Sequence, residues 1–307
     1  MKSLLISRSG IVVVAIALLI AIAGHNGYLE NASSGLYDKL RGLGDPPTAG
    51  VTVVALDEAS LAALDEYPVR DETHVRVLDN LLNAGVKAVG LVGLHSLIEG
   101  GNAEEGALAY PAVQGTQLAE AIDRLRNQSS IVSSIPFVDR SSSDPATKLP
   151  GYIIQNSLPG ISGSRVVAAR PVINLPETTS GPAASFASIL LDSDNGRTVR
   201  SVPLFVEANG LLIPSIALHL YIRSQGERLA DLKVGDSGDL TLAGGEIVSD
   251  IKLQTWPYLH DTGNETEPAF DMVSYHDVLH GAVSRQELNG KIVLLGVTAR
   301  GLVPAVR

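Results

Sequence analysis

The chain has 307 residues and carries 33 Asp and Glu against 23 Lys and Arg, which gives a formal net charge of −10. So acidic a chain lacks the basic surface that nucleic acids require, and this argues against DNA or RNA as a partner. Hydrophobic residues make up 45% of the chain, enough for a sizeable core. The absence of cysteine excludes disulfides, thiolate nucleophiles and cysteine-bound metals.

The N-terminus has the pattern of a membrane or export segment. Residues 1–10 form a short basic leader, and residues 11–24 form an apolar run without a charged side chain. A retained anchor with its positive end inside fits this pattern, and so does a secretory signal cut after the Ala-Ile-Ala site that ends at Ala23. Both interpretations export the chain from about residue 25 onward. We expect a retained single transmembrane helix.

The pattern beyond the N-terminus changes at residue 51. Residues 25–50 are polar and rich in turn residues, and we interpret them as a connector. Buried β-branched runs then alternate with segments whose apolar residues recur at helical spacing, which is typical of a parallel sheet covered by helices. The predicted elements are, in order, strand 51–56, helix 59–65, helix 73–84 closed by Gly85, strand 86–94, helix 116–127 and strand 130–137.

The second half is less regular and ends in another buried strand. The pattern predicts an exposed loop over 139–151, short extended pieces over 152–210, a helix over 214–224, a Gly-rich hairpin over 235–245, a short helix over 274–280, a helical turn from 284 and a strand over 291–297. Ser-x-x-Asp and Ser-x-x-Glu capping boxes mark the starts of the last two helices. We predict one α/β domain over 51–307, a mostly parallel sheet with flanking helices and a β-rich insertion, preceded by one N-terminal transmembrane helix.

Catalytic and metal-binding motifs are not evident. The chain has no G-x-S-x-G nucleophile turn and no phosphate loop ending in Gly-Lys-Ser/Thr. His276 and His280 are four residues apart and could share a helix face as two zinc ligands do, but Asp277 replaces the glutamate of a metalloprotease helix and no third ligand is evident. We therefore expect surface histidines, no metal, no cofactor and no enzymatic activity. An exported α/β hydrolase is the weaker alternative.

A candidate ligand site follows the first predicted strand. Asp57 and Glu58 stand at its carboxyl end, where open α/β sheets place their ligand crevices. Arg70 and His74, at the start of the next long helix, could reach the same crevice. Asp57 could also cap the short helix 59–65, and that alternative stays open.

Seven short motifs in a fixed order resemble those of one family. They are the segments at 36–41, 53–61, 67–74, 194–200, 212–218, 277–281 and 288–296. The second reads Val-Val-Ala-Leu-Asp-Glu-Ala-Ser-Leu and is similar to the family's strand-Asp-Glu-x-Ser-Leu motif. In this order the motifs resemble the second type of CHASE domain, the cyclase and histidine-kinase associated sensory extracellular domain of bacterial receptors.

The resemblance implies a function for the exported part. It implies a signal-sensing input domain in the periplasm or outside the cell, without a reaction of its own, held to the cell membrane by the N-terminal helix. The signal would be an unknown small molecule or protein, and a homodimer is compatible with such a role. The output module, commonly a nucleotide cyclase, a histidine kinase or a diguanylate cyclase, is not encoded here. The alternative takes the end at Arg307 literally and expects a stand-alone exported structural or interaction subunit of the cell envelope.

Overall fold

The structure is a computed structural model that describes most of the chain from residue 50 to residue 299, with gaps. The chain divides into residues 1–48 and residues 49–307. The described residues are 50–65, 69–92, 130–135, 137–139, 149, 151–161, 166–171, 183–186, 193–194, 198–199, 201–235, 237–256 and 270–299. The predicted transmembrane helix at 11–24, the connector up to residue 49 and the helix predicted over 116–127 lie outside them. Within these ranges no helix is both long and apolar enough to cross a membrane.

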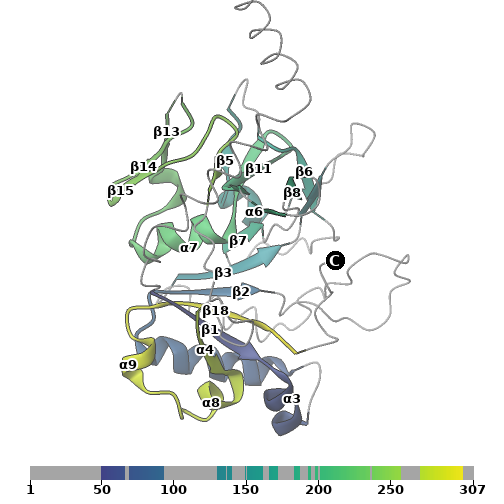
Figure 1. Cartoon of the computed structure of the whole chain (residues 1–307), viewed down its shortest axis with the longest axis vertical. Coiled ribbons are helices and arrows are strands. Elements are labelled where there is room, and N and C mark those ends of the chain that lie inside the picture. Colours follow the sequence, from purple (N-terminus) through teal and green to yellow (C-terminus); the bar gives the residue numbers. More distant parts are fainter. Residues whose placement is uncertain are drawn as a thin grey trace, which may run out of the picture. The chain divides into compact units, whose positions relative to one another are not determined.

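A six-stranded parallel sheet forms the centre of the domain (Figure 1). Its order is β17–β1–β18–β2–β3–β7, and every neighbouring pair is parallel. The strands are β1 (Val51–Leu56), β2 (Ala88–Val92), β3 (Ser130–Ile135), β7 (Ala183–Phe186), β17 (Asp271–Ser274) and β18 (Ile292–Val297). The prediction that the last strand returns to the same sheet is confirmed, because β18 lies between β1 and β2.

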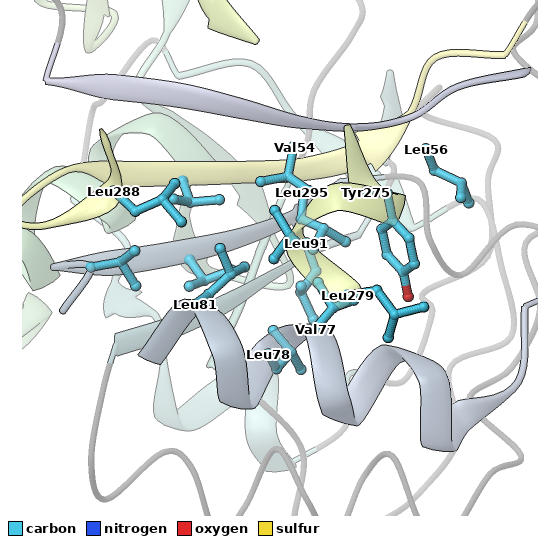
Figure 2. Packing of buried hydrophobic residues seen from close by; sticks show 14 of the residues in the cluster. Val54, Leu56, Val77, Leu78, Leu81, Leu91, Tyr275, Leu279, Leu288 and Leu295 are labelled. Atoms are coloured by element: carbon cyan, nitrogen blue, oxygen red, sulfur yellow. The ribbon is translucent and has the colours of Figure 1, made fainter. Parts of the chain in front are cut away.

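Helices cover both faces of this sheet (Figure 1). One face carries α3 (Glu58–Leu64), α4 (Asp71–Ala84), α8 (Tyr275–Leu279) and α9 (Arg285–Leu288), and the other carries α7 (Ile216–Ser224). The alternation of side chains along β18 explains both contacts. Val293 and Leu295 join the large hydrophobic cluster with α4, whereas Ile292 and Leu294 pack on the side of Leu220 in α7. Figure 2 shows the first of these clusters, in which Leu81, Leu91 and Leu295 come from α4, β2 and β18.

Small antiparallel sheets lie in the part of the chain between β3 and β17, which also contains β7 and α7. They pair β4 (Phe137–Asp139) with β6 (Ala169–Pro171), β8 (Ser193–Asp194) with β9 (Thr198–Val199), β10 (Val202–Pro203) with β16 (Gln254–Thr255), β5 (Leu158–Pro159) and β11 (Phe205–Ala208) with β12 (Leu211–Pro214), and β13 (Lys233–Val234) and β15 (Gly245–Ile247) with β14 (Leu240–Leu242). Two further short helices, α6 (Gly151–Gln155) and the 3-10 turn η1 (Leu229–Asp231), lie in the same part. The expected β-rich insertion is confirmed, and the Gly-rich hairpin is extended to three strands.

Helix ends agree with the sequence in most places. Gly85 has a left-handed φ of 86° at the end of α4, and Ser215 caps α7 by accepting from the Leu218 amide. The capping box of Ser284 and Glu287 is present at α9. Helix α4 begins at residue 71, two residues earlier than predicted, because the Arg70 carbonyl already accepts from the amides of Thr73 and His74.

The capping box predicted at Ser274 and Asp277 is wrong. Ser274 stands at the N-cap of α8, but its side chain makes no capping hydrogen bond. Its hydroxyl is 2.9 Å from the Ser60 hydroxyl of α3 instead. A tertiary partner has replaced the local one, and this contact belongs to the candidate site.

Candidate ligand site at the carboxyl ends of β1 and β17

Asp57 connects the end of β1 to the start of α3. Its backbone is extended, with φ −90° and ψ 177°, and its Oδ1 accepts a hydrogen bond from the Ser60 amide at 2.7 Å. This is the geometry of an N-cap residue, which satisfies one of the amides that a helix start leaves without an intrahelical acceptor. The capping alternative for Asp57 is therefore confirmed. A role of its half-buried carboxylate in ligand binding stays a prediction.

Ser60 joins this cap to the neighbouring strand. Strands β1 and β17 are paired in parallel, with Ala55 opposite Ser274, so their carboxyl ends lie together. The fully buried Ser60 hydroxyl lies 2.9 Å from the Ser274 hydroxyl and 3.3 Å from the His276 amide, which donates to it. One hydroxyl thus connects α3 to the junction of β17 and α8.

His74 and Tyr275 form a second connection, inside the core. The side chain of Tyr275 is 0% exposed and that of His74 is 8% exposed, and the tyrosine hydroxyl lies 2.8 Å from His74 Nδ1. The two rings meet edge to face, with centroids 5.7 Å apart. In Figure 2 the Tyr275 ring extends from α8 and its hydroxyl points toward α4, the helix that carries His74. This contact connects the first turn of α4 to the first residue of α8.

The four predicted site residues therefore lie at one edge of the sheet, with different surroundings. Asp57 and the exposed Glu58 begin α3, and the exposed Arg70 stands at the N-cap of α4 without a capping side-chain bond. His74 lies beneath them in the interior. A series of contacts runs from Asp57 through Ser60 to Ser274, whose chain neighbour Tyr275 contacts His74. The arrangement offers charged groups at the surface and a hydrogen-bonded support below.

A comparison with protein-family models identifies the class of domain. The model of the CHASE2 domain matches residues 11–306. The chain belongs to the CHASE2 family. Members of this family are extracellular sensory domains, so the chain is a sensory domain of that class. No curated protein and no solved structure matches the chain.

Sequence reasoning missed three residues of the candidate ligand site at the carboxyl ends of β1 and β17 in this CHASE2 domain. Ser60 could have been found, because it lies in the segment 53–61 that carries the family resemblance and is the only polar residue buried in α3. Ser274 and Tyr275 could not, because their partners are 214 and 201 residues away in the sequence. No local pattern reports such pairs.

The CHASE2 domain was also considered from the sequence for one pair of metal-binding histidines, His276 and His280. The described ranges contain no group of three or more His, Asp or Glu side chains that could hold a metal ion. His276 and His280, the pair considered from the sequence, lie on one side of α8 with ring centroids 4.2 Å apart.

Proposed function

We propose that this CHASE2 domain is the extracytoplasmic signal-sensing input domain of a bacterial transmembrane receptor. The family match over residues 11–306 carries the proposal. The basic leader followed by the apolar segment 11–24 supports a single membrane anchor with the domain on its outer side. The output activity would come from a module other than this domain.

The signal would bind at the carboxyl ends of β1 and β17. Ligands of open α/β sheets bind in the crevice outside the carboxyl ends of the strands, and Asp57, Glu58 and Arg70 place charged side chains at this edge. These three groups would contact the ligand. His74 would act from below, because its bond to Tyr275 holds the first turn of α4 against α8.

The hydrogen bonds beneath the site could transmit the effect of ligand binding from α3 and α4 to α8. A ligand shifts a two-state equilibrium only by its differential affinity for the two states. The Ser60–Ser274 and His74–Tyr275 contacts connect three helices and one strand at this edge. A ligand that draws the starts of α3 and α4 together would change the geometry of both contacts and so favour one packing of α8.

A thermal-shift screen of the full chain in mild detergent tests the site. Charged and polar metabolites are added one at a time, since a ligand that binds only the native state stabilises it by about 2.7 kcal/mol at 100 times its Kd. We expect a hit whose shift is lost in Asp57→Asn and Arg70→Gln. Asparagine caps a helix as well as aspartate does, so Asp57→Asn removes the charge while the melting temperature without ligand stays the same.

Matched controls lie on α4, the helix that follows Arg70. Asp79→Asn and Arg76→Gln remove the same charges from exposed positions of α4. These two variants should keep the full shift. A hit that survives unchanged in both site variants would show that the ligand binds elsewhere.

The cellular location is tested by cell fractionation and by protease treatment of spheroplasts. An antibody against the chain should detect it in the membrane fraction, and protease added outside spheroplasts should remove the signal. A chain that stays protected until the cells are lysed would contradict the extracytoplasmic placement. A signal in the soluble exported fraction would contradict the anchor and favour a released subunit.

A further inference from the structure

The end of α8 brings two histidine side chains together at the surface. His276 and His280 are one helical turn apart, and the His280 amide donates to the His276 carbonyl at 3.1 Å. Their rings are stacked at a tilt of 35° with centroids 4.2 Å apart. The His276 side chain is 37% exposed, and His280 is also exposed. Solvent ions can therefore reach both rings.

A hydrogen bond at one ring and a neighbouring charge at the other favour the same tautomer in both rings. His280 Nδ1 lies 2.9 Å from the His276 carbonyl oxygen, which can only accept, so this nitrogen carries the proton. His276 Nδ1 lies 3.6 Å from the Asp277 carboxylate, whose negative charge favours a proton on the same atom. In the neutral form of each ring the lone pair is then on Nε2.

We propose that His276 and His280 bind a divalent first-row transition-metal ion, Cu²⁺ or Zn²⁺, through their Nε2 atoms. Metal-ligating histidines almost always donate their other ring N–H to a carbonyl or carboxylate. His280 Nδ1 has a carbonyl oxygen at hydrogen-bond distance, and the carboxylate nearest to His276 Nδ1, that of Asp277, is 3.6 Å away. The geometry of α8 supplies what the sequence motif could not, namely the orientation of both rings.

The spacing of the rings suits two adjacent positions of one metal ion. Imidazole nitrogens bound at 2.0–2.1 Å in adjacent positions of a tetrahedral or tetragonal ion lie about 3 Å apart. The ring centroids are 4.2 Å apart, so the two rings are close enough to share one ion, and the proposal requires side-chain rotations that turn both Nε2 atoms toward it. Water would complete the coordination, because the described residues offer no third His, Asp or Glu ligand in a metal-binding group. The site is expected to be of moderate affinity, and tighter for Cu²⁺ than for Zn²⁺.

This inference does not depend on the sensory role, because metal binding to α8 can be measured whether or not the domain transmits a signal. The untagged full chain in detergent is titrated with Cu²⁺ and separately with Zn²⁺ by isothermal calorimetry. The Cu²⁺ form is then examined by electron paramagnetic resonance for coupling to imidazole nitrogen. We expect one site per chain, weakened at least about tenfold in His276→Ala and equally in His280→Ala, since each variant removes the chelate.

Two controls make the result specific. The melting temperature without metal should be the same in wild type and in both variants, because neither ring is buried, and Zn²⁺ should raise it only in wild type. The double variant His276→Ala with His280→Ala defines the background of other ligands in the chain. Binding in the double variant as tight as in wild type would overturn the proposal. A loss confined to one single variant would also overturn it, because the other histidine would then not be a ligand.

Discussion

The hydrogen bond between Tyr275 and His74 lies in the interior, where Tyr275 is 0% exposed and His74 is 8% exposed. Changing Tyr275→Phe removes the hydroxyl and leaves His74 Nδ1 without that partner in the interior. A buried polar group left unsatisfied costs about 1–3 kcal/mol of unfolding free energy. We expect a loss in that range by guanidinium denaturation, with the native circular dichroism spectrum retained.

Tyr221→Phe is the matched control for that change. Tyr221 is half-buried in α7 at the border of another cluster, and the same deletion of a hydroxyl there should change stability by less than about 0.5 kcal/mol. Equal losses in the two variants would show that the His74 contact adds nothing beyond the removal of a tyrosine hydroxyl.

A second residue, His219, makes the stability of the domain depend on pH. Burial, and to a lesser extent the neighbouring Arg223 charge, lowers the pKa of His219 from 6.5 to about 3. The unfolded chain therefore binds a proton at a higher pH than the folded chain does. The stability that neutral His219 supports is fully present above about pH 6.5 and is lost as the pH falls toward about 3, by at most about 1.4 kcal/mol per pH unit.

The contribution of His219 can be separated from that of the carboxylates with one variant. Leucine at this position fills a similar volume of α7 with an apolar side chain and cannot bind a proton. We expect the unfolding free energy of His219→Leu, measured between pH 7 and pH 4, to fall less steeply than that of wild type. Parallel curves for the two proteins would show that His219 is protonated alike in the folded and unfolded states.

At the scale of an element, one glycine fixes the shape of the hairpin formed by β13, β14 and β15. Gly238 has a φ of 97°, and a Cβ at this position would overlap the Asp250 carbonyl group. Gly226 has a similar φ of 75°, but no atom lies within 4 Å of its hypothetical Cβ. Alanine at Gly226 should therefore cost only the backbone strain of a left-handed residue, about 1 kcal/mol.

Alanine at Gly238 adds a backbone overlap to that strain. The segment around Asp250 must then move, and with it the hydrogen bond that Ser249 donates to the Gly238 carbonyl. We expect Gly238→Ala to lower the unfolding free energy by at least about 3 kcal/mol, measured beside Gly226→Ala in denaturant. Similar losses in both variants would mean that this turn rearranges freely.

Helix ends and short strands differ in how far the sequence could predict them. Gly85, Ser215 and the Ser284 box were predictable because each helix end depends on residues within a few positions of it. Ser274 was not, since its hydroxyl has a tertiary partner in α3. Strand β17 was missed as well. It is a four-residue edge strand with two exposed residues, so it lacks the apolar run that revealed β1 and β18.

For the whole molecule, the order of strands and helices was enough to predict the layers but not the neighbours. The alternation of buried strands and helices implied a parallel sheet, and the structure has one. The candidate ligand site exists because β17 lies beside β1. This placement depends on a long connection from β7, the strand at the opposite side of the sheet. For that reason the sequence predicted one shared crevice for Asp57, Glu58, Arg70 and His74. It could not identify Tyr275 as the partner of His74.

Helix α7 couples the sheet to the β-rich insertion, and this predicts one cooperative unfolding unit. Its Ile216 and Leu220 pack against the sheet strands, whereas Leu218 and Ile222 belong to the cluster of the insertion. Because one helix contributes to both clusters, loss of either should release the other.

Two core truncations test this cooperativity. Leu295→Ala opens a cavity in the sheet cluster and Leu240→Ala opens one in the insertion cluster, and each should cost about 2–5 kcal/mol. Trp256, the single tryptophan of the chain, follows β16 and reports on the insertion by fluorescence, while far-ultraviolet circular dichroism reports on all helices and strands. We expect both probes to give the same denaturation midpoint in wild type and to shift together in each variant. If Leu295→Ala lowered the dichroism midpoint and left the Trp256 midpoint in place, the insertion would be a separate folding unit and α7 would not couple it to the sheet.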